Sequence, residues 1–332
     1  MKGDAVPIQL ENILLIANPA SQNGNGAHLA EEAMETLFRR MTDASIEVIL
    51  TTHPHHATEL AADAAAFDTV IALGGDGLVH ETVNGLMQLP KELRPQLGVI
   101  PTGSGNDFAK SLGMPKGVKR ACKAICTASS LPTDIGQVNG HWFMETLSFG
   151  LDAAIALDTV ERRVRTGQKG TLLYGASAAH QLKNSFTAYR YTLCLDDGEP
   201  LHGESITFAV QNGPYYGSGF KICPDAKLDD GLFNLCISHP PISRTKASFA
   251  FLRAKAGRHT SMRELSFHTA SKLVLDFDDA PFAQMDGEAI GGTHFEARMD
   301  HSALHVLFPL HSSRQKEGAR MREPLIGRED QN

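Results

Sequence analysis

Apolar runs and amphipathic helix patterns alternate along the first third of the chain. Four short, mostly apolar runs predict strands: residues 12–17, 46–50, 69–73 and 97–100. The runs over 12–17 and 69–73 are typical of parallel strands buried on both faces. Apolar side chains at helical spacing follow the first three over 27–41, 57–66 and 78–87, and a further helix is predicted to begin near Phe108. Consecutive strand–helix units predict a parallel, Rossmann-like α/β sheet.

After a last helix predicted over 116–129, the pattern changes to short strands and hairpins. Asn139-Gly140 and Asp197-Gly198 are hairpin turn signals. They lie among strand-like runs (142–147, 189–195, 205–210, 304–308) and three helical patterns (153–164, 172–183, 245–256). We therefore expect a nucleotide-binding α/β domain over 1–131, completed by 302–322, a β-rich domain with a few helices over 132–301, and a charged tail over 312–332.

Composition narrows the class of protein. A length of 332 residues suits two domains, and the formal charge of −7 disfavours a nucleic-acid-binding protein, which would carry a basic excess. The five cysteines are scattered without a Cys-x-x-Cys pair, so neither a zinc site nor a disulfide framework is indicated. Because no apolar run is long enough to cross a bilayer and no signal peptide is evident, we expect a cytoplasmic protein that meets membranes only peripherally.

The loop Gly74-Gly75-Asp76-Gly77 joins a predicted strand to a predicted helix. Glycines allow close approach of a ligand to the backbone, and a helix N-terminus favours an anion such as phosphate. Asp76 would repel phosphate unless a cation such as Mg²⁺ lay between them, and the alternative is that it caps the helix. On position alone the two interpretations are about equal.

Three motifs together resemble one family. No Gly-x-x-x-x-Gly-Lys-Ser/Thr loop and no Gly-x-Gly-x-x-Gly fingerprint occurs. Instead Asn18-Pro19, Gly74 to Gly77 and Gly103-Ser-Gly-Asn-Asp-Phe108, in this order, resemble the diacylglycerol kinase catalytic domain family of lipid kinases. Leu78 and His80 replace the usual threonine and asparagine of its bacterial members, so that this stretch is closer to the sphingosine kinase version.

The resemblance implies roles for residues of the first domain. The nucleotide, ATP, would be bound by Asn18, by Thr51 or Thr52, by Ser104, and by the backbone of Gly74, Gly75, Asp76 and Gly77. Asp76 and Asp107 would together hold the catalytic Mg²⁺, directly or through water, as carboxylates commonly do in phosphoryl transfer. The motifs do not decide between the two threonines.

Two segments of the second domain also match the family. In the first, the carboxylate of Asp230 and the backbone carbonyls of Lys227 and Leu232 would hold a structural Mg²⁺, although Asp-Asp-Gly is also an ordinary turn sequence. In the second, Gln284-Met-Asp-Gly-Glu288, the resemblance makes Glu288 the general base, whereas without it an exposed hairpin turn would be favoured.

The sequence therefore predicts an ATP-dependent lipid kinase that phosphorylates the hydroxyl of diacylglycerol or a related lipid alcohol. Its expected partners are a membrane lipid and the membrane surface but no nucleic acid, and a homodimer is left open. Two alternatives remain: an NAD kinase, which shares Gly-Gly-Asp-Gly, and a catalytically silent nucleotide- or lipid-binding regulator. His53-Pro-His-His56 has metal-ligand residue types but matches no recognised spacing, so metal binding there is disfavoured.

Overall fold

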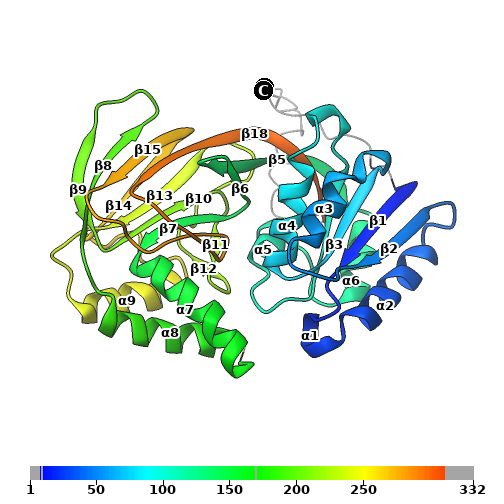
Figure 1. Cartoon of the computed structure of the whole chain (residues 1–332), viewed down its shortest axis with the longest axis horizontal. Coiled ribbons are helices and arrows are strands. Elements are labelled where there is room, and N and C mark those ends of the chain that lie inside the picture. Colours follow the sequence, from blue (N-terminus) through cyan, green and yellow to red (C-terminus); the bar gives the residue numbers. More distant parts are fainter. Residues whose placement is uncertain (1–7, 9, 169, 311–332) are drawn as a thin grey trace, which may run out of the picture.

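The computed structural model describes residues 8, 10–168 and 170–310. The molecule has two lobes, which the long strand β18 (His294–Phe308) connects across the top in Figure 1. The predicted tail over 312–332, and the part of the predicted completing segment beyond residue 310, lie outside the described residues.

The first lobe is built on four parallel strands, in the spatial order β2-β1-β3-β4. Each strand is a short apolar run, and every residue of β3 and β4 is buried. The strands are β1 (Asn12–Ala17), β2 (Ser45–Leu50), β3 (Thr69–Gly74) and β4 (Gln96–Pro101). Because they are parallel, their carboxyl ends lie at one edge, where ligands bind in open α/β sheets.

Helices cover both faces of this sheet. α2 (Gly26–Phe38) and α6 (Val118–Ile125) contact each other on one face, and α3 (His56–Ala62) and α4 (Asp76–Leu86) on the other. The apolar sides of these helices share one buried core with the strands. The remaining elements are short: α1 (Ser21–Gly24), α5 (Asp107–Leu112) and the 3₁₀ turns η1 (Ala64–Ala66) and η2 (Lys91–Leu93).

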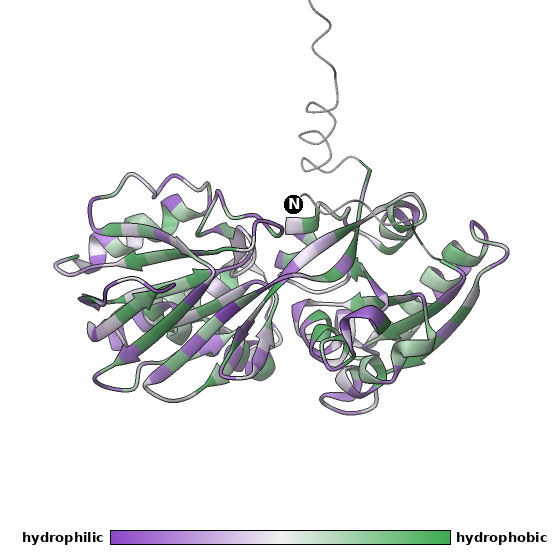
Figure 2. Ribbon diagram, turned by 90° about the horizontal axis from the view of Figure 1, so that it is seen from above, coloured by the Kyte–Doolittle hydropathy of each residue, from purple (hydrophilic) through white to green (hydrophobic). Residues whose placement is uncertain are grey.

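The second lobe packs two sheets around an aromatic core. One is a six-stranded sheet in the order β14-β13-β10-β7-β16-β17, and the other is the far part of the ten-stranded sheet that begins in the first lobe. Phe143, Phe149, Phe208, Phe233 and Phe295 lie between them and are almost completely buried. Figure 2 shows apolar residues along the strands of both lobes.

The strands of this lobe are short and mostly antiparallel. They are β5 (Ser129–Val138), β6 (His141–Phe143), β7 (Thr146–Gly150), β8 (Tyr189–Leu195), β9 (Leu201–Ser205), β10 (Thr207–Gln211), β11 (Tyr215–Tyr216), β12 (Phe220–Lys221), β13 (Phe233–Ser238), β14 (Leu265–Ala270), β15 (Lys272–Phe277), β16 (Ala283–Met285) and β17 (Glu288–Ile290). Three helices form a layer beneath the six-stranded sheet in Figure 1: α7 (Leu151–Thr166), α8 (Thr171–Asn184) and α9 (Arg244–Ala254).

Two strands belong to both lobes. The first part of β18 pairs with β15, its last part pairs with β4 at Val306 and Leu97, and β5 runs antiparallel beside both parts. The register of β18 against β5 shifts between Asp300 and Leu304, which is where the strand passes from one lobe to the other. The two lobes are therefore joined by continuous hydrogen-bonded strands.

The predicted fold class is confirmed, with corrections to individual elements. The helix predicted over 57–66 ends at Ala62, and a 3₁₀ turn follows. The strand predicted over 142–147 is two strands, β6 and β7, because the backbone N–H groups of Met144, Glu145 and Thr146 donate to the carboxylate of Asp286. Apolar composition predicted an extended segment here but could not predict the interruption, which depends on a residue 140 positions away.

Candidate active site

The loops that follow β3 and β4 pack directly against each other at the carboxyl edge of the first sheet. The N–H group of Thr102 donates to the carbonyl of Gly74. A Cβ atom built on Gly103 would lie 2.4 Å from the Cα atom of Gly75, so only two glycines allow this approach. The Gly-Gly-Asp-Gly loop and the Gly103–Phe108 motif thus form one structure.

Asp76 joins the two loops through hydrogen bonds. Its carboxylate oxygens accept the backbone N–H groups of Asn106 at 2.6 Å and of Asp107 at 2.7 Å, at the start of α5. The helix that Asp76 begins, α4, has Gly75 at its N-cap and no side-chain cap. The alternative that Asp76 caps its own helix is therefore wrong.

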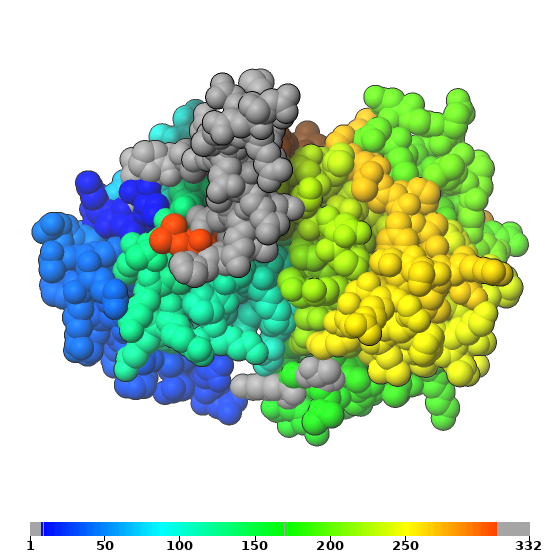
Figure 3. Space-filling model, turned by 180° about the vertical axis from the view of Figure 1, so that it is seen from behind, coloured from blue at the N-terminus to red at the C-terminus, as the bar shows by residue number. Residues whose placement is uncertain are grey.

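Asp107 connects the first lobe to the second. One carboxylate oxygen lies 2.8 Å from the Nζ atom of Lys110, and the other accepts the backbone N–H of Ser218 at 2.8 Å. Ser218 lies between β11 and β12 of the second lobe, and in the rear view the two lobes lie against each other in this region (Figure 3). Asp107 is buried, so that this contact is shielded from water.

The electrostatics at Asp76 suit a divalent cation. Burial, and then the charge of Asp107, raise the pKa of Asp76 to about 7, against the opposing effect of the two backbone N–H donors and Lys110. A carboxylate oxygen that accepts one hydrogen bond retains a second lone pair. A cation bound between Asp76 and Asp107 would remove the repulsion between these carboxyl groups, so the pair fits Mg²⁺.

The glycines of the motif have different structural roles. A Cβ atom on Gly74 would lie 2.5 Å from the Cδ2 atom of Leu78, and one on Gly75 would lie 3.1 Å from the Cα atom of Gly103. These two glycines are needed for packing within the protein. A Cβ atom on Gly77 would meet nothing within 4 Å, so Gly77 is the glycine that faces open space.

The predicted general base, Glu288, lies close to the same helix. It begins β17, directly after the hairpin turn at Asp286-Gly287, and its Oε2 atom is 3.8 Å from the Nε2 atom of His80. His80 lies one turn after Asp76 on α4. The structure therefore brings Glu288 of the second lobe beside the helix that carries Asp76.

His80 and Asp286 are functional candidates that were not predicted. The Nδ1 atom of His80 is 3.0 Å from the Oδ2 atom of Asp286, and both side chains are buried. These residues are 206 positions apart, so no local pattern could have revealed the pair. The only sequence signal was the departure from the usual asparagine at position 80.

Glu145 is a second unpredicted candidate. It is buried, and neither carboxylate oxygen has a hydrogen-bond partner within the described part of the chain. Ser111 is the neighbour that favours its charged form. Burial, together with the charges of Asp107, Asp286 and Asp76, raises its pKa well above the ordinary value. Burial therefore favours the protonated, neutral form of Glu145.

A polar cleft of about 920 Å³ adjoins these loops. Ser104 lines it, whereas the other residues predicted to bind nucleotide do not. Its charged lining is basic apart from Glu32 and was not predicted: Lys110, Lys116, Lys119, Arg120 and Lys255. Such a lining attracts phosphate groups. Of these residues, Lys110 could have been predicted from the sequence, because it lies one turn after Asp107 of the family motif.

Asn18 and Thr51 lie at the same edge of the sheet, directly after β1 and β2. The side-chain carbonyl of Asn18 accepts the backbone N–H of Ala20 at 2.8 Å, which shapes its own loop. The backbone N–H of Thr51 donates to the carbonyl of Ala17 at 2.9 Å. Both residues therefore lie at the predicted edge, and their role in nucleotide binding stays a prediction.

The turn predicted to hold a structural ion is attached to the junction between the lobes. The carboxylate of Asp230 accepts the N–H of Leu232 at 3.1 Å, and that of Asp134 on β5 accepts the N–H of Gly231 at 2.7 Å. Partial burial, and the charges of Asp134 and Asp229, raise the pKa of Asp230. Repulsion among these carboxylates is what a bound cation would relieve, so Asp230 with the carbonyls of Lys227 and Leu232 fits a structural ion.

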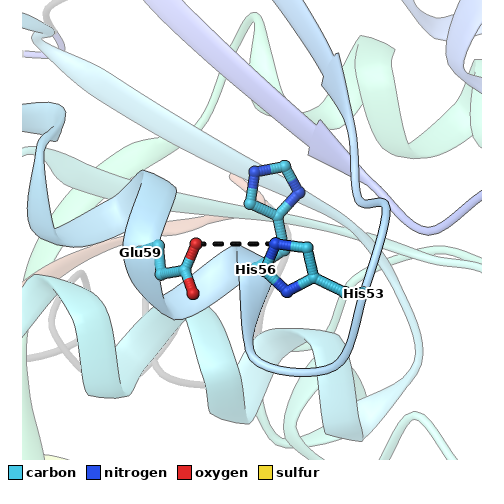
Figure 4. A group of neighbouring side chains, drawn as sticks. All are labelled: His53, His56 and Glu59. Carbon is cyan, nitrogen blue, oxygen red and sulfur yellow. Dashed lines mark ion pairs between the residues drawn. The ribbon is translucent and has the colours of Figure 1, made fainter.

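The disfavoured histidine cluster is present in space but is already hydrogen-bonded. His53, His56 and Glu59 place ligand-type atoms within 4.8 Å of one another, and His53 forms an ion pair with Glu59 (Figure 4). The Nδ1 atom of His56 accepts the N–H of Thr52 at 3.1 Å. In that tautomer Nε2 carries the proton, so neither nitrogen of neutral His56 is free to bind a metal.

An apolar cavity of about 90 Å³ lies between α7, α8, α9 and the six-stranded sheet. Its walls are mainly aliphatic and aromatic, including Ile155 of α7, Ala178 of α8, and Ala250 and Phe251 of α9. No helix within residues 8, 10–168 and 170–310 is both long and apolar enough to cross a bilayer. An apolar cavity beneath a layer of helices suits the hydrocarbon part of a ligand.

The parallel sheet, the joined glycine loops and the carboxylates at the junction define a two-domain phosphotransferase of the kinase type. Residues 12–138 match the family "Diacylglycerol kinase catalytic domain", and residues 145–308 match "YegS C-terminal NAD kinase beta sandwich-like domain". The chain is 30% identical over 312 residues to the "Diacylglycerol kinase" of Bacillus subtilis (strain 168), which covers 91% of this chain and 97% of that protein. The chain therefore belongs to the diacylglycerol kinase-like family of lipid kinases.

A further relative by sequence and two solved structures are also similar, the structures in fold alone. The "Probable lipid kinase YegS-like" of Cronobacter sakazakii (strain ATCC BAA-894) is 29% identical over 295 residues, covering 86% of this chain and 94% of that protein. The structure of a diacylglycerol kinase from Bacillus anthracis str. Sterne has a TM-score of 0.71 at 20% identity, covering 90% of this chain and 97% of that one. Yeast NADH kinase complexed with NADH shares the fold at a TM-score of 0.51 and 11% identity, covering 97% and 90%.

Proposed function

We propose that the chain transfers the γ-phosphoryl group of ATP to the hydroxyl of diacylglycerol or a related lipid alcohol. The observation that carries this proposal is the meeting of the two lobes at α4. Asp76 at the start of that helix faces Asp107, and His80 one turn later contacts Asp286 and Glu288 of the second lobe. Phosphoryl transfer needs a nucleotide side and an acceptor side in this proximity.

On the nucleotide side, the phosphates would lie over the loops after β3 and β4, with the basic cleft attracting their charge. Asp76 and Asp107 would hold Mg²⁺, which neutralises charge on the phosphates when it is bound. Ser104 and the backbone around Gly77 would contact phosphate oxygens, while Asn18 and Thr51 would contact the rest of the nucleotide. Asp230, with the carbonyls of Lys227 and Leu232, would hold a second, structural ion.

On the acceptor side, Glu288 would act as the general base. Its carboxylate takes the proton of the lipid hydroxyl as the hydroxyl oxygen forms a bond to the γ-phosphorus. The bond between that phosphorus and the oxygen bridging to the β-phosphate breaks, and ADP leaves with the bonding electrons. The proton on Glu288 then passes to water, which restores the carboxylate.

The helical layer of the second lobe would receive the lipid. Its apolar cavity suits acyl chains, and among the described residues five large apolar side chains on α7, α8 and α9 are exposed: Val160, Val164, Leu172, Phe249 and Leu252. Arg163 and Arg165 lie beside Val164 near the end of α7. Exposed apolar side chains next to basic ones favour the surface of an anionic membrane, from which the lipid would be taken.

The proposal is tested by an ATP phosphoryl-transfer assay on mixed micelles. The acceptor panel contains diacylglycerol, monoacylglycerol, phosphatidylglycerol and sphingosine, with NAD as a soluble alternative. We expect phosphorylation of a glycerolipid, and Glu288→Gln should lower kcat by about 10² or more with little change in ATP binding. Phosphorylation of NAD alone would assign the chain to NAD kinases, and binding of ATP and lipid without transfer would make it a regulator.

A further inference from the structure

His80 occupies a position from which it contacts groups of both lobes. It lies on α4, four residues after Asp76, so the two side chains project from the same face of the helix. The Nδ1 atom of its ring is hydrogen-bonded to Asp286, and its Nε2 atom lies 3.8 Å from the Oε2 atom of Glu288. Its side chain is only 6% exposed, compared with 45% for Glu288.

Asp286 is held firmly, so it anchors the ring of His80. Its carboxylate accepts the N–H groups of Met144, Glu145 and Thr146 at 2.7, 3.1 and 2.9 Å, in addition to its contact with His80. Its side chain is 1% exposed. Since Asp286 accepts from the ring, Nδ1 of His80 carries a proton, and Nε2 is left to face Glu288.

Within the described residues, Glu288 has no comparable anchor of its own. It lies on the short edge strand β17 after a two-residue turn, and nearly half of its side chain is exposed. A glutamate in that setting samples several rotamers in water unless a neighbour attracts it. His80, when protonated, is the cationic partner that the described structure places beside it.

We propose that His80 is a positioning residue: it holds the carboxylate of Glu288 toward the nucleotide loops and fixes its place relative to Asp76. This inference rests on the proposed function, because it assigns a role in the transfer step. The contacts of His80 with Asp286 and Glu288 give it a role that is exerted through Glu288. An asparagine at position 80 would carry no charge and would have no second ring nitrogen to face Glu288.

The charged groups around His80 favour its protonated form. Burial opposes the charge on the ring, but the hydrogen bond and charge of Asp286, then the charges of Glu288 and of Glu81 on α4 itself, outweigh it and raise the pKa of His80 above 6.5. The other polar neighbour is Asn84, whose Nδ2 atom lies 3.2 Å from Nε2 and donates to two backbone carbonyls, those of His80 at 3.0 Å and of Trp142 at 3.1 Å. The imidazolium therefore attracts Glu288 until the pH rises through this pKa.

Two substitutions test the two contacts of the His80 ring separately, because each removes one contact. His80→Asn places an amide nitrogen near the position of Nδ1, so it keeps a donor to Asp286 and removes the group facing Glu288. His80→Gln reaches toward the position of Nε2 and removes the donor to Asp286. We expect His80→Asn to keep the melting temperature and the KM for ATP within about twofold, and to lower kcat about 10- to 100-fold, as misplacement of a reacting group does.

The pH profile supplies a readout that a purely structural role would not change. In the wild type, kcat should fall on the alkaline side as His80 loses its charge, and His80→Asn should lack that fall. A wild-type kcat and pH profile in His80→Asn would overturn the inference. His80→Gln should instead lose stability, because Asp286 keeps its backbone donors but loses its buried side-chain donor.

A measurement without turnover separates this inference from the proposed function. The pKa of the His80 ring, followed by nuclear magnetic resonance and assigned with the His80→Asn spectrum, should be lower in Glu288→Gln than in the wild type. An unchanged pKa would overturn the coupling even if the enzyme is active. If the wild type phosphorylates no lipid, the proposed function fails, and the titration alone decides whether His80 and Glu288 interact.

Discussion

At the scale of single residues, the site is a set of carboxyl groups whose environments differ. Asp76 is hydrogen-bonded by two backbone N–H groups, Asp107 pairs with Lys110, and Glu145 is buried without a hydrogen-bond partner in the described chain. Asp76 and Glu145 both have raised pKa values, chiefly because of burial. A cluster of this kind costs stability when all of its members are ionised, which is common at functional sites.

Glu145→Gln tests this cost. A raised pKa in the folded state means that the folded protein holds its proton more tightly than the unfolded one, so the contribution of Glu145 to stability is present at low pH and is lost as the pH rises through the folded-state pKa. In buffer with a chelator, the glutamine variant should be more stable than the wild type by at least about 1 kcal/mol at pH 8. The difference should shrink toward pH 4. Urea unfolding at both pH values measures it, and a difference that does not vary with pH would show that Glu145 keeps an ordinary pKa.

At the scale of elements, the glycines in the loop between β3 and α4 have two different roles. Some allow close packing within the protein, and one leaves space for a ligand. Gly74 and Gly75 permit contacts with Leu78 and Gly103, whereas Gly77 borders open space. The three glycines look equivalent in the sequence. Their neighbours in three dimensions distinguish them.

Gly77→Ala should therefore separate folding from nucleotide binding. Alanine is the better helix former by roughly 0.5–1 kcal/mol, so the melting temperature should stay the same or rise. The new methyl group would occupy space that the phosphates need, so the KM for ATP should rise at least about tenfold. Gly175→Ala is the matched control, because Gly175 lies in α8 with nothing within 4 Å of an added Cβ atom. Unchanged ATP affinity in Gly77→Ala would remove this loop from the phosphate site.

The turn that carries Asp230 makes a separate prediction. If it holds a structural ion, added Mg²⁺ stabilises the folded protein by mass action, and Asp230→Ala should abolish most of that gain in thermal unfolding. Asp225→Ala, an exposed carboxylate in the same segment, is the control and should respond to Mg²⁺ like the wild type. If Mg²⁺ stabilised both variants equally, Asp230 would be an ordinary turn residue and not an ion ligand.

At the scale of the whole molecule, the site forms only where the lobes meet. Asp107 contacts Ser218, and His80 contacts Asp286, while β5 and β18 run through both lobes. The apolar cavity lies in the second lobe alone. The chemistry thus depends on the junction, and acceptor binding depends on the helical layer.

Filling the cavity tests that division. Ala250→Phe on α9 adds a ring to the cavity wall, so the KM for long-chain diacylglycerol in mixed micelles should rise several-fold, with a smaller rise for short chains. The KM for ATP should not change, because the nucleotide loops belong to the other lobe. Ala179→Phe, on an exposed side of α8, is the matched control. Equal effects on both lipids, or on ATP, would argue against an acyl site here.

Much of the site was predictable because it lies in local motifs. The apolar runs predicted β1 to β4, and parallel pairing necessarily brings the residues after them to one edge, so the positions of Asp76, Asp107 and Ser104 follow from the sequence. The role of Glu288 was predicted only through the family resemblance. His80, Glu145 and the basic cleft were missed, because each depends on contacts between residues far apart in the chain.

The sequence by itself determined the two-part α/β and β-rich organisation, the glycine loops and the family. These features depend on apolar periodicity and on turn residues, which act over a few positions. Only the tertiary structure decided which glycine faces open space, which partners Asp76 accepts from, and that His80 lies between Asp286 and Glu288. Hydrogen bonds and charge interactions act through space over a few ångströms. They form here because β18 and the β16–β17 hairpin bring distant parts of the chain close to α4, and no local sequence pattern encodes that arrangement.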